Sequence, residues 1–196
     1  MKYVTIIFAL FLSGCIFYSP PKRDDFKFSA DSLTSISELK FGFYIHEVGP
    51  ANKDEGFIGS DDLPDINNYS LYEPIVLLPN NEFYWDYKNA AKSKSEFCEN
   101  FVKFFLKKHS RKRSGDPYGL YKKRNENSDT ILFEKVIPIR ESGMNLNYLA
   151  FGTFVEDTIT IFKEIQIKRD KIIRQKNMNN RFIYYPYPFD FKSPFE

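Results

Sequence analysis

The sequence has few of the residues and motifs that carry recognised chemistry. It contains two cysteines, Cys15 and Cys98, and two histidines, His46 and His109. It has no serine in a nucleophile-elbow pattern, no glycine-rich phosphate loop and no paired-histidine zinc motif. The sequence therefore indicates no cofactor and no metal centre, and it does not support an enzyme.

An excess of one charge and a long apolar run are also missing. The 28 Lys and Arg residues nearly balance the 26 Asp and Glu residues, for a formal net charge of +2. A nucleic-acid-binding domain carries a clear basic excess, so nucleic acid is excluded as the main partner. The longest apolar run, residues 4–12, has nine residues. A helix that spans a bilayer needs about 20, so we expect no transmembrane anchor.

The N-terminus has the parts of a secretory signal peptide. Lys2 gives the positive start, residues 4–12 the apolar core, and Ser13 and Gly14 the small residues of a cleavage zone. The run Leu12-Ser13-Gly14-Cys15 resembles the lipobox of bacterial lipoproteins. That resemblance implies cleavage before Cys15, transfer of diacylglycerol to its thiol, and acylation of the new amino terminus, commonly with palmitate. The alternative is an ordinary secretory signal followed by an unrelated cysteine.

Lipid on Cys15 would hold the protein on a membrane, because two or more acyl chains bind firmly where one does not. The next residue is Ile16, not the aspartate that signals inner-membrane retention in some bacteria, so the outer membrane is favoured. Lipidation leaves Cys98 as the free thiol and no intrachain disulfide. We expect Cys98 to be a small buried apolar residue. The expected location is the cell envelope.

The chain divides into three segments. Residues 1–14 are the signal peptide. Residues 15–36 hold the lipidated cysteine and a flexible tether, because Pro20-Pro21 and the charges after them do not favour a packed element. Residues 37–196 form a single globular β-rich domain of sufficient length for one hydrophobic core.

The first part of the domain predicts strands. Residues 39–48 alternate in polarity, which is typical of a half-buried strand with one apolar face and one face toward solvent. The predicted apolar face holds Leu39, Phe41, Phe43 and Ile45, and the opposite face holds Lys40, Tyr44 and His46. A loop is predicted over residues 49–70. Two strands, 75–78 and 82–87, should flank a turn at 79–81, with Trp85 packed in or beside the core.

One amphipathic helix is predicted from residue 94 to about residue 110. Ser93 and Glu96 form a capping box, in which each side chain bonds a backbone N–H of the first turn. Four phenylalanines follow at helical spacing and form one apolar stripe. They are Phe97, Phe101, Phe104 and Phe105.

The second part predicts β-hairpins. Residues 119–133 and 152–161 both read Gly-x-aromatic, a polar turn, then Asp-Thr-Ile. Ile159, Ile161, Ile165 and Ile167 are predicted to share one strand face, with Thr158, Thr160, Glu164 and Gln166 opposite. A last strand covers residues 181–185. These units resemble those of small lipocalin-like lipoproteins of Bacteroidetes. We therefore predict an α+β fold, mainly an antiparallel β-sheet or open lipocalin-like barrel with one packed amphipathic helix.

Few side chains offer candidate sites. Cys98 and His109 are 11 residues apart in the predicted helix, about 16 Å along its axis, so they cannot form a catalytic dyad. A basic cluster ends the helix, and either it stabilises the helix dipole or it contacts anionic lipid or lipopolysaccharide. Its members are Lys107, Lys108, Arg111, Lys112 and Arg113.

Three functional hypotheses follow. The first is a membrane-anchored, non-enzymatic binding or structural module. The second is a lipocalin-like carrier with an aromatic-lined cavity for an apolar molecule. The third, with least support, is an envelope hydrolase that combines His46 with acidic residues of the 54–65 loop.

Overall fold

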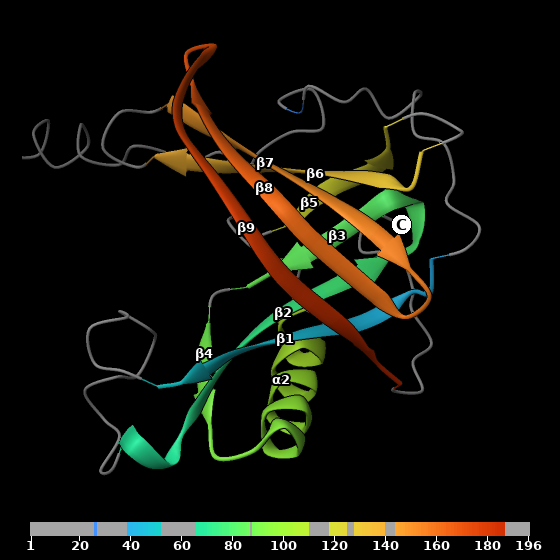
Figure 1. Cartoon of the computed structure of the whole chain (residues 1–196), viewed down its shortest axis with the longest axis vertical. Helices are drawn as coiled ribbons and strands as arrows, with labels where there is room; N and C mark the ends of the chain where they lie inside the picture. Colours follow the sequence, from blue (N-terminus) through green and yellow to red (C-terminus); the bar gives the residue numbers. More distant parts are fainter. Residues whose placement is uncertain are drawn as a thin grey trace, which may run out of the picture.

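The structure is a computed structural model, and it describes residues 26, 39–51, 66–86, 88–109, 118–124, 128–139 and 144–186. Within these residues, nine strands form one sheet and one α-helix lies beside it (Figure 1). The strands are β1 (Gly42–Pro50), β2 (Ser70–Leu78), β3 (Glu82–Trp85), β4 (Asn89–Ala91), β5 (Tyr118–Lys123), β6 (Thr130–Ile139), β7 (Met144–Val155), β8 (Thr158–Lys168) and β9 (Lys171–Tyr185). The helix is α2 (Lys94–His109), and short 3-10 turns occupy Ile66–Asn68 and Pro79–Asn81.

The sheet closes into a barrel of eight strands. Its order is β1-β9-β8-β7-β6-β5-β3-β2, and β2 pairs back with β1. Every pairing is antiparallel, and β4 lies outside the ring on the first residues of β2. This is an up-and-down barrel, interrupted only by β4 and α2 between β3 and β5. The predicted antiparallel sheet with one packed helix is confirmed, but the barrel is closed, whereas an open sheet or open barrel was predicted. The layered α+β description fits only the part of the wall that α2 covers.

The helix α2 begins and packs largely as its sequence predicts. The Glu96 backbone N–H donates to Ser93 Oγ at 3.2 Å, as the predicted capping box requires. The return bond to Glu96 Oε2 comes from the Lys92 N–H, at 3.0 Å, one residue before the cap. Phe97, Phe101 and Phe105 are buried, but Phe104 is 49% exposed. At 100° per residue, the buried face also includes Cys98 and Val102, which moves its centre away from Phe104.

The outer face of β1 and β2 lies under this helix. Phe43 contacts the rings of Phe101 and Phe105 edge to face, at 5.8 and 5.6 Å between centroids. The opposite face of β1 points into the barrel, where Tyr44 is fully buried. The predicted half-buried strand is therefore wrong, because both of its faces are covered. Phe41, predicted on the apolar face, is 47% exposed.

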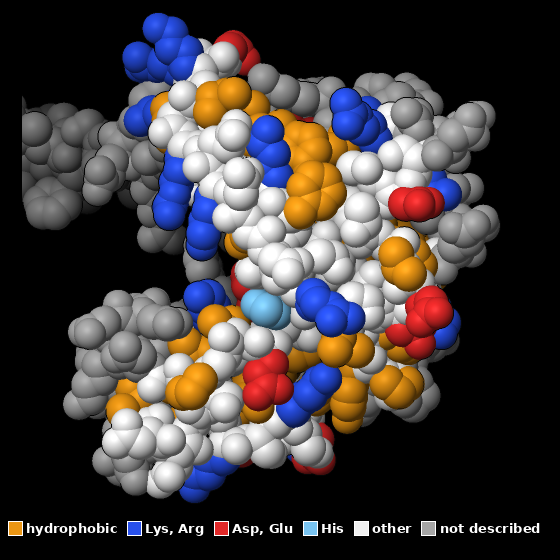
Figure 2. All heavy atoms as spheres, in the orientation of Figure 1, with side chains coloured by type: hydrophobic (Ala, Val, Ile, Leu, Met, Phe, Trp, Pro, Cys, Tyr) orange, Lys and Arg blue, Asp and Glu red, His pale blue; other side chains and the backbone are white. Residues whose placement is uncertain are grey.

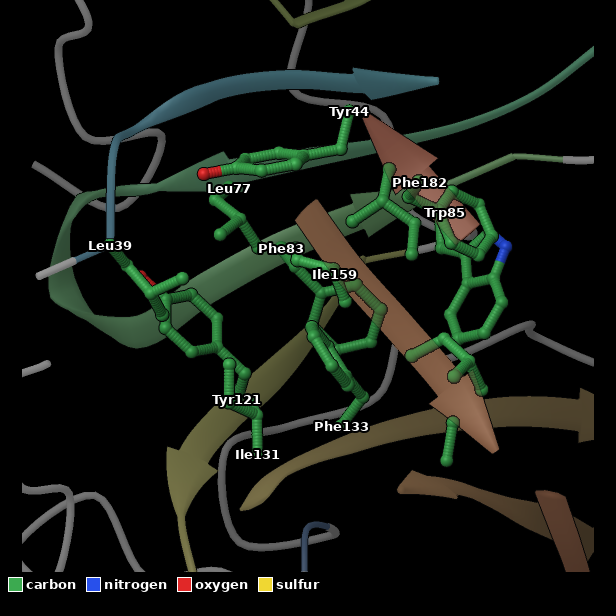
Figure 3. Packing of buried hydrophobic residues seen from close by; sticks show 13 residues of the cluster. Leu39, Tyr44, Leu77, Phe83, Trp85, Tyr121, Ile131, Phe133, Ile159 and Phe182 are labelled. Atoms are coloured by element: carbon green, nitrogen blue, oxygen red, sulfur yellow. The ribbon is translucent and has the colours of Figure 1, made fainter. Parts of the chain in front are cut away.

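Side chains from distant strands meet inside the barrel. Thirteen buried residues form this cluster, among them Leu39, Tyr121 and Ile159. Figure 3 shows them converging from opposite walls. Phe83 and Phe133 touch edge to face at 5.2 Å between centroids. Eight strands enclose a space that side chains can just fill.

The predicted hairpins are present, and the last strand is longer than predicted. β5 with β6 and β7 with β8 are antiparallel hairpins, as predicted. β9 runs for 15 residues rather than the predicted 181–185. Residues 171–180 were missed because they are mostly polar and lack period-two alternation. Their strand conformation comes from pairing with β8.

A bulge in β8 changes which side chains point inward. Ile161 pairs with Gly152 and Lys163 with Phe151, so Phe162 is the extra residue. β7 has no matching insertion, so the residues of β8 beyond Phe162 exchange faces. Ile159 and Ile161 point into the barrel, but Ile165 does not share their face. The predicted single isoleucine face is therefore wrong.

Candidate functional site

The inner face of the barrel changes from apolar to polar along its length. On β2, Leu77 and Ile75 belong to the buried cluster, and Glu73 is the next inward residue toward the start of the strand. On β6, Ile131 and Phe133 are followed inward by Lys135. Successive residues of a strand alternate between its two faces, so every second residue points inward. On both strands, the inward residue that follows the apolar ones is charged.

These charged residues gather at one end of the barrel. Lys135 pairs with Tyr148 across β6 and β7, and Glu164 pairs with Ala150 across β7 and β8. Partners directly opposite in a ladder share a face, so Glu164 and Tyr148 are both inward. We call this group the polar end. It consists of Glu73, Trp85, Lys135, Tyr148 and Glu164.

Trp85 joins the polar end to the apolar core. Its indole Nε1 donates to Glu73 Oε1 at 2.8 Å, and its carbonyl oxygen accepts from Lys135 Nζ at 3.0 Å. Its ring contacts Tyr148 and Phe182 edge to face, each at 5.7 Å between centroids. Trp85 is therefore held by both hydrogen bonds and ring contacts. It lies between the apolar core and the other members of the polar end.

The two carboxylates sit in different surroundings. Burial raises the pKa of Glu73, and the charge of Glu164 adds to the rise, while the Trp85 hydrogen bond and the nearby Lys88 and Lys135 oppose it. Glu73 Oε2 is buried and has no hydrogen-bond partner among the described residues. Glu164 instead accepts a hydrogen bond from Tyr148. Burial, together with the nearby charge of Glu164, raises the pKa of the Tyr148 hydroxyl.

The pairing of β1 with β9 is short beside this group. These strands pair only over residues 43–45 and 183–185, and then diverge within the described part of the chain. Glu73, Lys135, Tyr148 and Glu164 keep part of their surface exposed. Figure 2 shows the molecular surface recessed on the side where the β6–β9 strands separate from β1 and β4. Four of the five members of the polar end are therefore in partial contact with solvent, whereas Trp85 is only 4% exposed.

His46 lies at the divergence of β1 and β9. It is half-buried, its ring contacts Phe182 at 5.2 Å, and its Nδ1–H donates to the Arg181 carbonyl oxygen at 3.0 Å. Burial lowers the pKa of its imidazole. The predicted solvent-facing position is wrong, because residue 46 follows Tyr44 on the inner face. The loop acids that a His46-based hydrolase would need, in residues 54–65, lie outside the described residues.

The other sequence-predicted sites are only partly described. Lys107 is exposed near the end of α2, while the side chain of Lys108 and all of Arg111, Lys112 and Arg113 lie outside the described residues. Cys15 also lies outside them. The buried position predicted for Cys98 is confirmed, and burial raises the pKa of its thiol to about 11. The side chain of His109 is not described.

The polar end was missed by the sequence analysis. Its members come from five different strands, and no motif joins them. The one usable signal was the break in apolar alternation at Glu73 and Lys135, where a charge takes an inward position. Across the described residues, no group of His, Cys, Asp and Glu could hold a metal ion, and no helix is long and apolar enough to cross a membrane.

A search of protein-family models, of curated proteins and of solved structures found no match to the chain.

Proposed function

We propose that this chain is a lipid-anchored envelope protein whose barrel is a non-enzymatic binding module, with its ligand at the polar end. The observation that carries the proposal is the convergence of aromatic and charged side chains at the open end of a closed barrel. Small-molecule sites combine apolar walls with a few convergent polar groups in this way.

The chemistry of the polar end defines the kind of ligand that we expect. Glu164 offers carboxylate oxygens, Lys135 offers an ammonium donor, and the partly exposed Tyr148, packed against Trp85, offers aromatic surface. A small polar molecule with hydroxyl or amino groups and one apolar face would fit this set. We therefore expect a polar ligand in preference to a hydrocarbon chain.

A carrier of an apolar molecule is the second candidate, since up-and-down barrels of eight strands can enclose such ligands. The packing of the apolar core favours it less. Phe83 and Phe133 contact each other and Trp85 there, so an apolar guest would have to displace these rings.

Intrinsic fluorescence tests the ligand site, because Trp85 is the only tryptophan in the chain. A library of polar metabolites, sugars and amines is titrated against the protein, and a saturable change in Trp85 emission reports binding. Glu164→Gln should weaken any such ligand at least about tenfold if it bonds that carboxylate. The exposed helix residue Glu99 provides the control, Glu99→Gln, which should leave the affinity unchanged.

Other results would redirect the proposal. A fatty acid that binds with unchanged affinity in Glu164→Gln would favour the apolar carrier. A ligand whose affinity falls equally in both variants does not bind at the polar end.

The lipid anchor is tested separately by intact mass and membrane fractionation of the wild type and Cys15→Ala. Acyl mass and outer-membrane recovery in the wild type, lost in the variant, are the expected results. Equal masses and equal solubility would refute the anchor, and the binding module would then stand on its own.

A further inference from the structure

The end of the β8–β9 hairpin projects from the barrel. Figure 1 shows the turn between these strands reaching beyond the other described elements. Residues 171–177 of β9 are all exposed. Within the described residues they pair with β8 alone, since β1 reaches only residues 183–185. We call residues 168–176 the hairpin tip.

Positive charge is concentrated at the hairpin tip. It contains five basic residues and one acid, so it carries +4. The whole chain carries +2, which leaves the rest of the chain at +2 − 4 = −2. Figure 2 shows Lys and Arg side chains gathered at this end. The basic members are Lys168, Arg169, Lys171, Arg174 and Lys176, and the acid is Asp170.

Two large apolar side chains lie among these charges. Ile172 is 61% exposed and Ile173 is 54% exposed, although both are in a regular part of the fold. Ile172 pairs with Ile167 across the hairpin, and Ile173 is the extra residue of a second bulge. Exposed apolar residues surrounded by basic ones are typical of segments that bind the interface of an anionic membrane.

We propose that the hairpin tip docks on an anionic phospholipid surface. Ile172 and Ile173 enter the headgroup region, while the lysines and arginines around them contact lipid phosphates. A membrane fits better than an acidic protein, because phosphates on a fluid surface can meet basic side chains that point in several directions. The tip requires only that a bilayer be near, and the lipid anchor proposed above would supply that.

The covalent geometry permits both attachments at once. Lys40 binds Asp157 in the β7–β8 turn, at the end of β8 opposite the hairpin tip. The eleven residues of β8 separate these ends by about 37 Å. The 24 residues from Cys15 to Leu39 could extend to about 80 Å. An anchor at Cys15 therefore leaves the tip free to reach the same membrane.

Vesicle binding of unlipidated protein tests this docking independently of Cys15. The chain from residue 16 to residue 196, which retains every described residue, is sedimented with vesicles of phosphatidylglycerol or of phosphatidylcholine. We expect binding to phosphatidylglycerol that weakens with salt, and little binding to phosphatidylcholine. The variant Lys171→Glu with Arg174→Glu should bind at least about 20-fold more weakly, since each basic residue contributes about fivefold. The matched control is Lys94→Glu with Lys103→Glu on α2, which should bind like the wild type.

A fluorescent label tests insertion of the tip. Ile173→Cys is labelled with an environment-sensitive dye, while Cys98 is too buried to react. The emission should shift to the blue on phosphatidylglycerol vesicles, and the same dye at Val155→Cys, in the opposite hairpin end, should not respond.

Three results would overturn the proposal. They are an absence of binding to phosphatidylglycerol vesicles, equal losses in the tip and helix variants, and a dye at residue 173 that stays in water while the protein is bound. The last two would assign binding to another surface, such as the basic cluster at the end of α2. None of these results bears on lipidation of Cys15, which the mass measurement decides.

Discussion

The strand β2 and the first half of β9 show how differently two strands of one sheet can be used. Eight of the nine residues of β2, from Ser70 to Leu78, are uncharged, the exception being Glu73, and residues 74–78 are all buried. Residues 171–177 of β9 are all exposed. The helix α2 and the barrel interior cover the two faces of β2, whereas neither face of the hairpin tip is covered. Both segments are paired strands, so the difference between them lies in how far neighbouring elements bury their side chains.

This difference divides the molecule into a part that carries stability and a part that is available for contact. About 25 cal/mol is gained for each Å² of apolar surface removed from water, so the helix-covered strands should supply much of the folding free energy. The hairpin tip buries little and should contribute little. Four predictions test this comparison.

The largest effect is expected where the helix covers β1. Phe43→Ala removes a ring that is 1% exposed and contacts Phe101 and Phe105. It should lower the free energy of unfolding by about 3–5 kcal/mol, measured by urea denaturation. Ile172→Ala in the hairpin tip is the control and should change it by less than about 0.5 kcal/mol. Equal losses would mean that the tip is packed in solution.

The second-largest effect is expected where β3 pairs with β5. A Cβ at Gly119 would collide with the Glu134 carbonyl oxygen and the Phe83 ring. Gly119→Ala should therefore cost about 2–3 kcal/mol in thermal unfolding. Gly49→Ala meets nothing within 4 Å, and only its φ of +133° opposes it, so its cost should be about 1 kcal/mol. A neutral Gly119→Ala would show that the barrel relaxes at this join.

The third effect depends on pH and tests the polar end. Burial raises the pKa of Glu73 in the folded state above its ordinary value of 4.5. The folded protein then holds this proton more tightly than the unfolded chain does. The contribution of Glu73 to stability therefore falls as the pH rises from 4.5 to the higher folded pKa.

Glu73→Gln keeps the Oε1 acceptor of Trp85 and removes this dependence. The variant should match the wild type below pH 4.5 and exceed its stability at neutral pH, in a series of denaturation curves. A variant that is less stable at neutral pH would show that the Glu73 charge is compensated, for example by Lys135.

The smallest effect is expected at the exposed ion pair of Lys40 and Asp157. Their side chains lie 2.6 Å apart but are 54% and 51% exposed, so water and salt screen the attraction. Lys40→Ala should leave the urea midpoint within the error of repeated measurements. A clear loss of stability would mean that Lys40 supports the β7–β8 turn through its contact with the Tyr184 ring.

The sequence predicted those elements whose signals lie within a few residues. The Ser93 and Glu96 capping box places the start of α2, and the Glu156-Asp157 turn places the β7–β8 hairpin. These interactions join close neighbours in the chain, so the local pattern contains them. The buried position of Trp85 followed from its size and apolar surface.

The candidate site was not predictable in the same way. Trp85 and Glu73 are 12 residues apart, and Lys135 reaches Trp85 across 50 residues. Glu164 was predicted on the face opposite the isoleucines, and only the bulge at Phe162 turns it into the barrel beside Tyr148. A shift of one residue in register exchanges the faces of a strand, and the sequence carries no clear mark of it.

Local patterns in the sequence predict a β-rich domain, its amphipathic helix, its polar turns, and an N-terminus that resembles that of lipoproteins. Only the folded chain shows that the sheet closes, that β1 is buried on both faces, and that the β8–β9 hairpin projects. Turns, caps and periodicity are predictable because they arise between neighbours in the chain. Burial and closure depend on which distant strand or helix covers each face, as the bond from His46 to the Arg181 carbonyl, 135 residues away, illustrates.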